Sequence, residues 1–210
     1  MKKIEFSAGK LPVIIQSRKS KNSLLKRIVI LALLGMFFGT FLDFMHVFNK
    51  TTKYTYPVFF GVAWWIPLLY TASSVLIGLV NPVADKILGR KKFLPIKPRD
   101  LVLGFIGFCL VWYLSGSLHF SSVITTIILT PFTFLLWWKF DRTKEGIILA
   151  LTTAFCGCLA EIIISKAGLF QHTFQDFLGI PFWLPLIYIS GSISLGNIGR
   201  WLTFSKIDRI

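Results

Sequence analysis

Residues 101–138 read LVLGFIGFCLVWYLSGSLHFSSVITTIILTPFTFLLWW and carry no Asp, Glu, Lys or Arg side chain. The pair His119-Phe120 divides this stretch into two apolar runs, 101–118 and 121–138. At a rise of about 1.5 Å per residue, each run can form a helix that spans the roughly 30 Å hydrocarbon layer of a bilayer. Because the connection is so short, the two helices are predicted to form an antiparallel hairpin in a membrane.

Four further apolar runs extend this pattern over most of the chain. With 54% apolar residues and a mean hydropathy of +0.70, the composition excludes a soluble domain. The predicted membrane spans are residues 28–47, 62–79, 101–118, 121–138, 146–165 and 182–204. The connections are short, so the sequence predicts an all-α membrane protein, a single bundle of six transmembrane helices.

The two ends of the chain are polar and basic. Residues 1–27 are predicted to be a basic cytoplasmic segment with little regular structure, followed by the membrane domain, 28–204, and a cytoplasmic tail, 205–210. No small-residue cleavage site follows the first span, so this span is predicted to be a retained anchor and not a signal peptide.

The basic residues alternate in density along the chain, which has a net charge of +14. Counted by segment from the N-terminus, Lys and Arg number 8, 2, 6, 0, 3, 1 and 3, so alternate segments hold 20 of the 23. This positive-inside distribution predicts that both termini are cytoplasmic. It also indicates that the positive charge meets anionic lipid headgroups rather than nucleic acid.

The sequence offers no pattern typical of an enzyme, a metal site or a bound cofactor. All three cysteines lie inside predicted spans without CxxC spacing, as expected for small apolar core residues. His46, His119 and His172 occur in no metal-binding pattern, and His119 and His172 are expected to be solvated beside turns. There is also no nucleophile elbow or Gly-rich phosphate loop.

Two carboxylates lie within predicted spans, where ionisable groups are costly and often functional. Asp43 and Glu161 each lie fifteen residues into parallel spans, close to the non-cytoplasmic side, with His46 and Lys166 nearby. They could form a buried polar cluster, or they could reach water at the interface. Arg200, at the other end of the last span, is expected to extend to the cytoplasmic interface.

One short motif occurs twice. Trp65-Ile-Pro-Leu-Leu-Tyr70 is similar to Trp183-Leu-Pro-Leu-Ile-Tyr188, in spans predicted to be parallel. Two interpretations remain open. The prolines could begin helices whose tryptophans lie in the interfacial belt, or they could bend helices that flank a cavity.

Several motifs together resemble those of the Insig family, polytopic membrane regulators of sterol homeostasis. They are AWWIP at 63–67, SGSLHF at 115–120, LWWKFDRTKEG at 136–146 and GNIGR at 196–200. The resemblance implies a six-helix bundle that binds a sterol or another elongated lipid, such as a diacylglycerol or an isoprenoid. It also implies regulation of lipid homeostasis through a membrane-protein partner. The expected location is the endoplasmic reticulum membrane in a eukaryote or the cell membrane in a prokaryote, and a homo-oligomer is compatible with this picture.

The resemblance also suggests site residues. Phe108 and Trp137 match lipid-pocket positions of the family, and Asp141 matches an aspartate needed for partner binding. Ile124 stands where the family has a glutamine, with Thr125 beside it, so a lipid other than a hydroxylated sterol is an alternative ligand. The lipid-binding residues predicted in this way are Phe108, Ile124, Thr125, Trp137, Trp64 and Trp65.

Two other functions fit the same residues. Asp43 and Glu161 could serve a small proton-coupled membrane transporter, since carboxylates in spans often relay protons. A structural scaffold that binds no ligand would also account for an apolar bundle.

Overall fold

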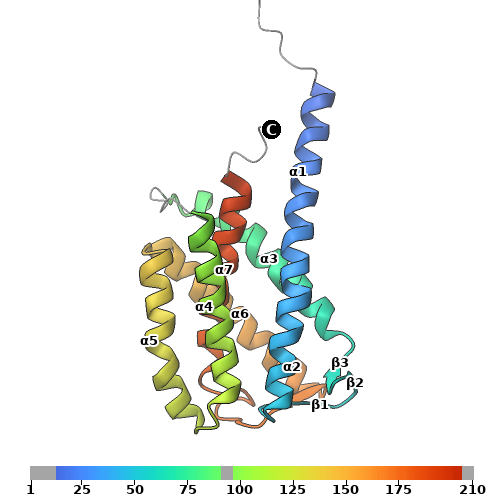
Figure 1. Ribbon diagram of the computed structural model, residues 1–210, viewed down its shortest axis with the longest axis vertical. Coiled ribbons are helices and arrows are strands. Elements are labelled where there is room, and N and C mark those ends of the chain that lie inside the picture. The colour runs from blue at the N-terminus through green and yellow to red at the C-terminus, as the bar shows by residue number, and fades with distance from the viewer. Residues whose placement is uncertain (1–12, 91–96, 205–210) are drawn as a thin grey trace, which may run out of the picture.

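The computed structural model describes residues 13–90 and 97–204, and side chains from Ser23 onward. The predicted tail, 205–210, lies outside the described residues. The chain forms a bundle of long helices with two pairs of short strands at one end (Figure 1). The helices are α1 Val13–Leu34, η1 Gly35–Gly39, α2 Thr40–Phe48, α3 Ile66–Ile87, α4 Pro98–Ser117, α5 Ser122–Phe140, α6 Lys144–Lys166 and α7 Leu184–Phe204.

Helices α1, η1 and α2 follow one another without a break and form one continuous rod, called the first rod below. The middle element, η1, is one turn of π-helix between Gly35 and Gly39. The helix begins at Val13, well before the predicted span at 28–47, so the described part of the predicted N-terminal segment is helical. The expectation of little regular structure there was wrong.

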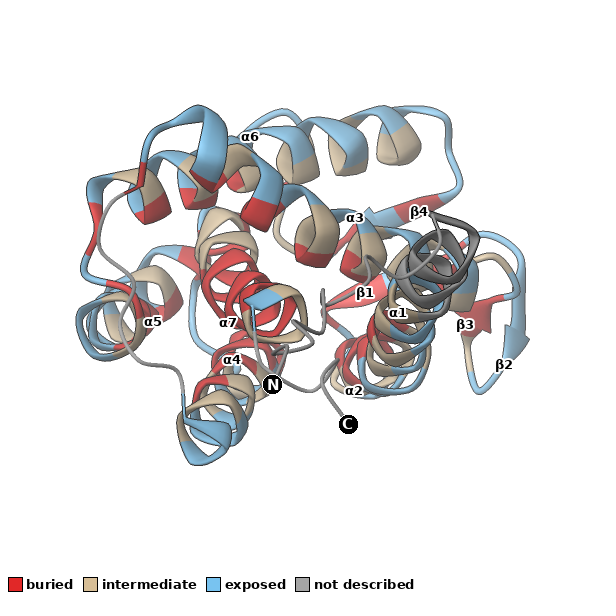
Figure 2. Ribbon diagram, turned by 90° about the horizontal axis from the view of Figure 1, so that it is seen from above, coloured by how far each residue is buried: buried red, intermediate tan, exposed pale blue. Residues whose placement is uncertain are grey.

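Five helices of the described chain are long and apolar enough to cross a membrane: Ser23–Phe48, α3, α4, α5 and α6. This confirms the prediction of a helical membrane protein. The remaining predicted span, α7, is more polar, with Ser190, Ser192, Ser194, Asn197 and Arg200 all buried. Figure 2 shows why, because α7 lies in the middle of the bundle and packs against α3, α4, α5 and α6. A helix that contacts protein on every side needs no lipid-facing apolar surface.

The all-α prediction missed four short strands. Strand β1, Thr52–Tyr54, pairs antiparallel with β4, Phe170–His172, and β2, Pro57–Phe59, pairs with β3, Val62–Ala63. The β1–β4 pair joins the segment after α2 to the segment after α6, more than a hundred residues apart. Three-residue strands carry too little periodicity to be seen in a sequence.

The boundaries of the second predicted span were also wrong. Residues 62 and 63 belong to β3, and α3 runs on to Ile87, past Pro82. Pro82 has no N–H for the carbonyl of Gly78 four residues earlier. That carbonyl lies against α7, where a Cβ added to Gly199 would be 1.8 Å from it. The close α3–α7 contact thus needs a glycine at 199.

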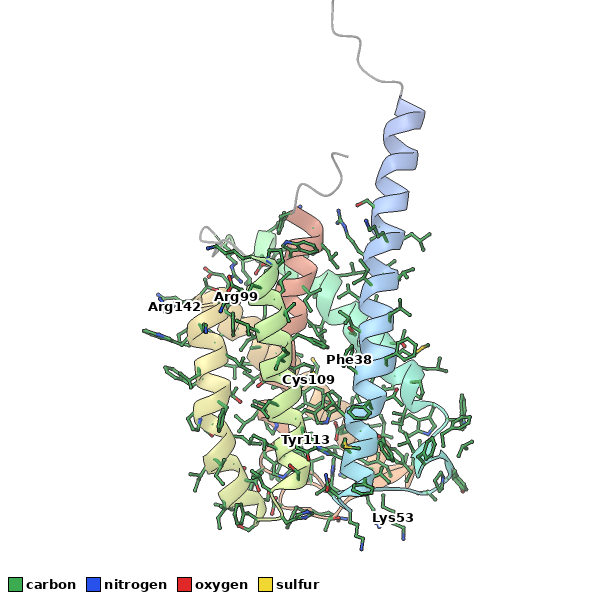
Figure 3. The ribbon with its side chains drawn as sticks, viewed as in Figure 1. Phe38, Lys53, Arg99, Cys109, Tyr113 and Arg142 are labelled. Atoms are coloured by element: carbon green, nitrogen blue, oxygen red, sulfur yellow. The ribbon has the colours of Figure 1, made fainter. Side chains whose placement is uncertain are left out.

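The described ends of the first and last helices lie at the same end of the bundle, opposite the strands (Figure 1). Arg99 and Arg142 lie toward that end, and Lys53 lies at the strand end (Figure 3). The arrangement agrees with an even number of crossings. The cytoplasmic location of this end remains a prediction from the charge distribution.

Candidate functional site

A cavity lies between the first rod and helices α3, α4, α6 and α7. The space between these walls, counted together with the open solvent at its mouth, is about 1120 Å³. Apolar side chains form most of its wall, and polar side chains gather where the helices meet β1 and β4. The apolar residues include Phe38, Leu69, Phe105, Phe108, Ile164 and Ile187, and the polar residues include Asp43, Tyr54, Tyr70, Glu161, His172 and Tyr188.

Glycines set the position of two tyrosines in the cavity wall. A Cβ added to Gly39, in the π-helical turn, would lie 2.7 Å from the Cβ of Tyr70. A Cβ added to Gly157, on α6, would lie 2.3 Å from Cε1 of Tyr188. Since real Cβ atoms do not approach so closely, each tyrosine occupies the space left by an absent side chain. π-Helical turns occur often at functional sites.

The carboxylate of Asp43 is buried and bound by two of these tyrosines. The Tyr54 hydroxyl donates to Asp43 Oδ2 at 2.8 Å, and the Tyr70 hydroxyl donates to Oδ1 at 3.0 Å. Asp43 is only 5% exposed and lies inside the bundle. Burial, and next the charge of Asp43, raise the pKa of the Tyr54 phenol well above its usual value. Tyr54 therefore remains a donor.

The second carboxylate, Glu161, has a matching set of partners. The Tyr188 hydroxyl donates to Glu161 Oε1 at 2.5 Å, and His172 Nε2 lies 2.7 Å from Oε2. The expectation that His172 is solvated was wrong, because pairing of β4 with β1 turns its ring inward, where it is 4% exposed. Of the two sequence interpretations, the structure contains the polar cluster, in which Asp43 is buried and the Glu161 side chain is 16% exposed. Lys166 is exposed and lies outside it.

Aromatic rings connect the two carboxylates. Trp183 packs edge-on against His46, with ring centroids 5.5 Å apart, and against His172 at 5.9 Å. His46 Nε2 donates to the carbonyl of Trp112 at 3.0 Å. Trp183 is fully buried, so the interpretation of this tryptophan as part of an interfacial belt was wrong. Pro67 and Pro185 do lie in the first turns of α3 and α7, as the helix-start interpretation expects.

A second polar cluster lies at the opposite end of the bundle, near the C-terminal ends of α3, α5 and α7. Two aspartates, Asp85 and Asp141, meet two arginines, Arg90 and Arg200. Arg200 Nε donates to Asp85 Oδ2 at 2.6 Å, and its Nη1 donates to Asp141 Oδ2 at 3.3 Å. Arg90 Nη2 donates to Asp141 Oδ1 at 3.2 Å. Arg200 is 1% exposed, so the expectation that it extends to the interface was wrong.

Asp141 also organises the connection between α5 and α6. Its Oδ1 accepts from the Thr143 backbone N–H at 3.1 Å, and Thr143 Oγ1 in turn accepts from the N–H of Gly146 at 3.1 Å. The carboxylate of Asp141 is 1% exposed. A partner cannot touch it directly in this conformation, so any effect on partner binding passes through the turn that it holds.

Two of the six predicted lipid-binding residues line the cavity, and the other four lie outside it. Phe108 and Trp65 line the cavity. Trp64 is 60% exposed and lies outside it. Ile124, Thr125 and Trp137 belong to α5, which packs on α4 and α7 and contributes nothing to the cavity wall.

Sequence reasoning missed the tyrosines. Tyr70 and Tyr188 end the two copies of the repeated Trp-x-Pro motif, and each donates to one of the two carboxylates. The signal was present in the repeat, but the partner of each tyrosine lies on another helix. Among the residues that the structure describes, no group of His, Cys, Asp and Glu is arranged to hold a metal ion.

The comparisons with known proteins all match this chain to one family. Residues 108–203 match the family model described as Insulin-induced protein (INSIG). The chain is 30% identical to insulin-induced gene 1 protein of Danio rerio over 200 residues, which cover 93% of this chain and 79% of the relative. It is 31% identical to the protein of that name in Homo sapiens over 192 residues, covering 90% and 69%.

A similar fold is found in a solved structure. The crystal structure of a mycobacterial Insig homologue from Mycobacterium vanbaalenii superposes with a TM-score of 0.76 and 19% identity. The match covers 86% of this chain and 96% of that one. A second solved structure with a TM-score of 0.76 is a cross-linked trimer of the same homologue.

Proposed function

The chain belongs to the Insig family of membrane proteins, and we propose that it binds one elongated lipid in the cavity between α2, α3, α4, α6 and α7. The observation that carries the proposal is the pairing of long apolar walls with a polar end formed by Asp43, Glu161 and their tyrosine partners. A sterol, a diacylglycerol or an isoprenoid has the matching shape, an apolar body with a small polar head.

Apolar burial alone would not select the ligand. In a bilayer the competing solvent is itself acyl chain, so moving a lipid into an apolar cavity gains little free energy. Selectivity then comes from the shape of the wall and from hydrogen bonds at the polar end. Both features are present in this cavity.

The proposal is tested by binding of labelled sterols and diacylglycerols to the purified protein. Ser73 lines the cavity, so Ser73→Trp should fill part of it and reduce binding at least tenfold. Trp137→Ala is the matched variant on α5, where Trp137, Ile124 and Thr125 define the alternative lipid-binding face. If Trp137→Ala abolishes binding and Ser73→Trp does not, the ligand lies on α5 and the cavity proposal fails.

For the biological role, we extend the proposal to regulation of lipid homeostasis through a membrane-protein partner, without catalysis. Asp141 would affect the partner by holding the α5–α6 turn, so Asp141→Asn should weaken partner capture without changing lipid binding. Membrane fractionation would distinguish the endoplasmic reticulum from the cell membrane. A homo-oligomer, as in the cross-linked trimer of the mycobacterial homologue, would appear as a mass near three times 23.9 kDa in detergent.

A second function is favoured by one observation, the meeting of Asp43 and Glu161 at the same cavity. A proton-coupled transporter would show solute flux that depends on a pH gradient and is lost in Asp43→Asn. The measurement is uptake into proteoliposomes over a panel of solutes. Absence of flux at every gradient would exclude the transporter and leave the binding protein.

A further inference from the structure

The β2–β3 hairpin presents an uncharged, apolar surface to its surroundings. It belongs to the connection between α2 and α3, and residues 54–84 contain no Asp, Glu, Lys or Arg. Phe60, at its tip, is 85% exposed. The other large exposed side chains of this connection, each between 57% and 68% exposed, are Tyr56, Val58, Phe59 and Trp64. Connections that face water usually carry polar residues, so a contiguous apolar patch here indicates contact with an apolar medium or partner.

The tip of the hairpin holds a phenylalanine where a smaller residue is locally favoured. Phe59 pairs with Val62, so Phe60 and Gly61 form a two-residue turn, with φ angles of 49° and 84°. Asn, Asp and Gly are preferred at positive φ in such turns, and bulky side chains are uncommon there. The local backbone therefore does not account for Phe60, and its ring must be favoured by what surrounds the tip.

The hairpin extends to the side of the bundle and continues a lipid-facing surface. Seen along the helices, β2 and β3 lie at the edge of the bundle, outside α1 (Figure 2), and they lie at the level of α2 (Figure 1). The Phe60 ring packs edge-on against Phe44 of α2, with centroids 5.8 Å apart. Phe44 also contacts Phe41 and Phe48, which are exposed on the candidate membrane span Ser23–Phe48. Lipid that covers these rings would also meet the hairpin.

The side chains around the tip are those favoured at a membrane–water interface. Tyr56 and Trp64 each join an apolar ring to one polar group, as in the aromatic belts of membrane proteins. Lys50 and Lys53 are exposed close by along the chain, and Lys53 lies at the strand end of the molecule (Figure 3). Their positive charge matches lipid phosphates. A two-stranded hairpin leaves outer backbone groups unpaired, so it suits the boundary between headgroups and acyl chains and not the bilayer centre.

We propose that the β2–β3 hairpin is an interfacial anchor, which lies at the headgroup–acyl boundary of the leaflet at the strand end, with Phe60 among the acyl chains. A lipid surface fits this patch because the patch continues onto a membrane span and is bordered by lysines. The hairpin joins Tyr54 to Trp65, whose rings are 5.7 Å apart and both line the cavity. Anchoring would therefore fix the depth of this part of the cavity wall, whatever ligand the cavity binds.

The test measures the depth of the hairpin in a bilayer by fluorescence quenching. Cys109, Cys156 and Cys158 are replaced by alanine in the full-length protein, and a fluorophore is attached at Phe60→Cys or at the matched control Lys53→Cys. The protein is reconstituted into phosphatidylcholine vesicles. Lipid with a nitroxide near the top of the acyl chain should quench the label at 60 about threefold more than the label at 53. Iodide, present on both sides of the membrane, should show the reverse order.

A second variant tests the role of the Phe60 ring. Phe60→Asn suits the positive φ of the turn, so the protein should remain folded, as checked by thermal unfolding. A label at Val58→Cys should then be quenched by the nitroxide lipid about twofold less than in the presence of Phe60. Phe177→Asn, at an exposed phenylalanine in the connection between β4 and α7, is the matched control and should leave quenching at 58 unchanged.

Each other outcome contradicts the anchor. If iodide quenches the labels at 60 and 53 equally, the hairpin extends into water. If neither quencher reaches the label at 60, a second copy of the chain or another protein covers the hairpin. If quenching at 58 is unchanged in a folded Phe60→Asn protein, Phe60 does not hold the hairpin in the membrane. None of these results depends on lipid binding in the cavity, so the anchor and the proposed function can fail separately.

Discussion

The two polar clusters of this bundle bind their carboxylates in different ways. At the end opposite the strands, Asp85 and Asp141 are bound by Arg90 and Arg200, and charges of both signs are buried together. At the strand end, Asp43 and Glu161 are bound by tyrosine hydroxyls and one histidine. The first cluster is closed and holds helix ends together. The second faces a cavity, and its carboxyl groups can still accept bonds. This contrast separates a structural site from the proposed binding site.

The largest effect is expected from breaking the closed cluster. Arg200→Met keeps most of the side-chain volume but leaves Asp85 and Asp141 with one arginine, so it should destabilise the protein by about 3–5 kcal/mol. The measurement is unfolding in detergent. Arg142→Met is the control; this arginine is exposed near the same end and contacts Trp138, so its loss should cost less than about 1 kcal/mol. Equal effects of the two variants would contradict the assignment of Arg200 as a structural residue.

The same substitution in both clusters sharpens the comparison. Asp85→Asn removes a charge that faces two arginines and should cost about 3 kcal/mol. Asp43→Asn keeps one oxygen that can accept from one of the two tyrosines, and its NH2 group can donate to the hydroxyl of the other, so it should cost about 1 kcal/mol. Both are measured as unfolding free energies under one set of conditions. A larger cost for Asp43→Asn would mean that the cavity carboxylate, and not the ion-pair cluster, dominates stability.

Two glycines test whether the cavity depends on close packing. A Cβ at Gly157 would lie 2.3 Å from the ring of Tyr188, whereas a Cβ at Gly104 would lie 3.7 Å from the ring of Phe140, an ordinary contact. Gly157→Ala should displace Tyr188 from Glu161 and cost about 1–3 kcal/mol. Gly104→Ala should be neutral or slightly stabilising, because alanine favours helix. If thermal unfolding shows the reverse order, Tyr188 is not held by this packing.

The smallest effects are expected from the repeated motif. Tyr70→Phe and Tyr188→Phe each remove one hydrogen bond to a carboxylate and should each cost about 1 kcal/mol. Because the two tyrosines contact different carboxylates, the double variant should cost the sum of the two. Tyr113→Phe, at a tyrosine 42% exposed on α4, is the control. A clear departure from additivity in chemical unfolding would show that Asp43 and Glu161 act as one unit.

Much of the fold could be predicted from short-range features. The hairpin of α4 and α5 follows from two uncharged apolar runs separated by two residues, and it is present with its turn at His119, which has a φ of 51°. Five of the six predicted spans meet the length and composition of membrane helices in the described chain. The resemblance to the Insig family, drawn from several motifs, is confirmed by the relatives.

The candidate site was predicted only in part. Asp43, Glu161 and Phe108 were singled out, and all three line the cavity. Tyr54 and His172 were not recognised, because they meet Asp43 and Glu161 only when β1 pairs with β4. Trp137 and Asp141 share a helix end, yet Trp137 is only partly buried while Asp141 faces the ion-pair cluster.

Local features located most of the long helices and assigned the chain to a membrane, because the length and charge of an apolar run can be read along the sequence. They did not determine which buried charges would meet. Asp141 and Arg200 lie far apart along the chain, and their contact depends on how α7 enters the bundle. That entry is set by close packing, as where Gly199 meets the backbone of Gly78. The packing of whole helices selects the partner of each buried polar group, so these partners could be identified only in the folded protein.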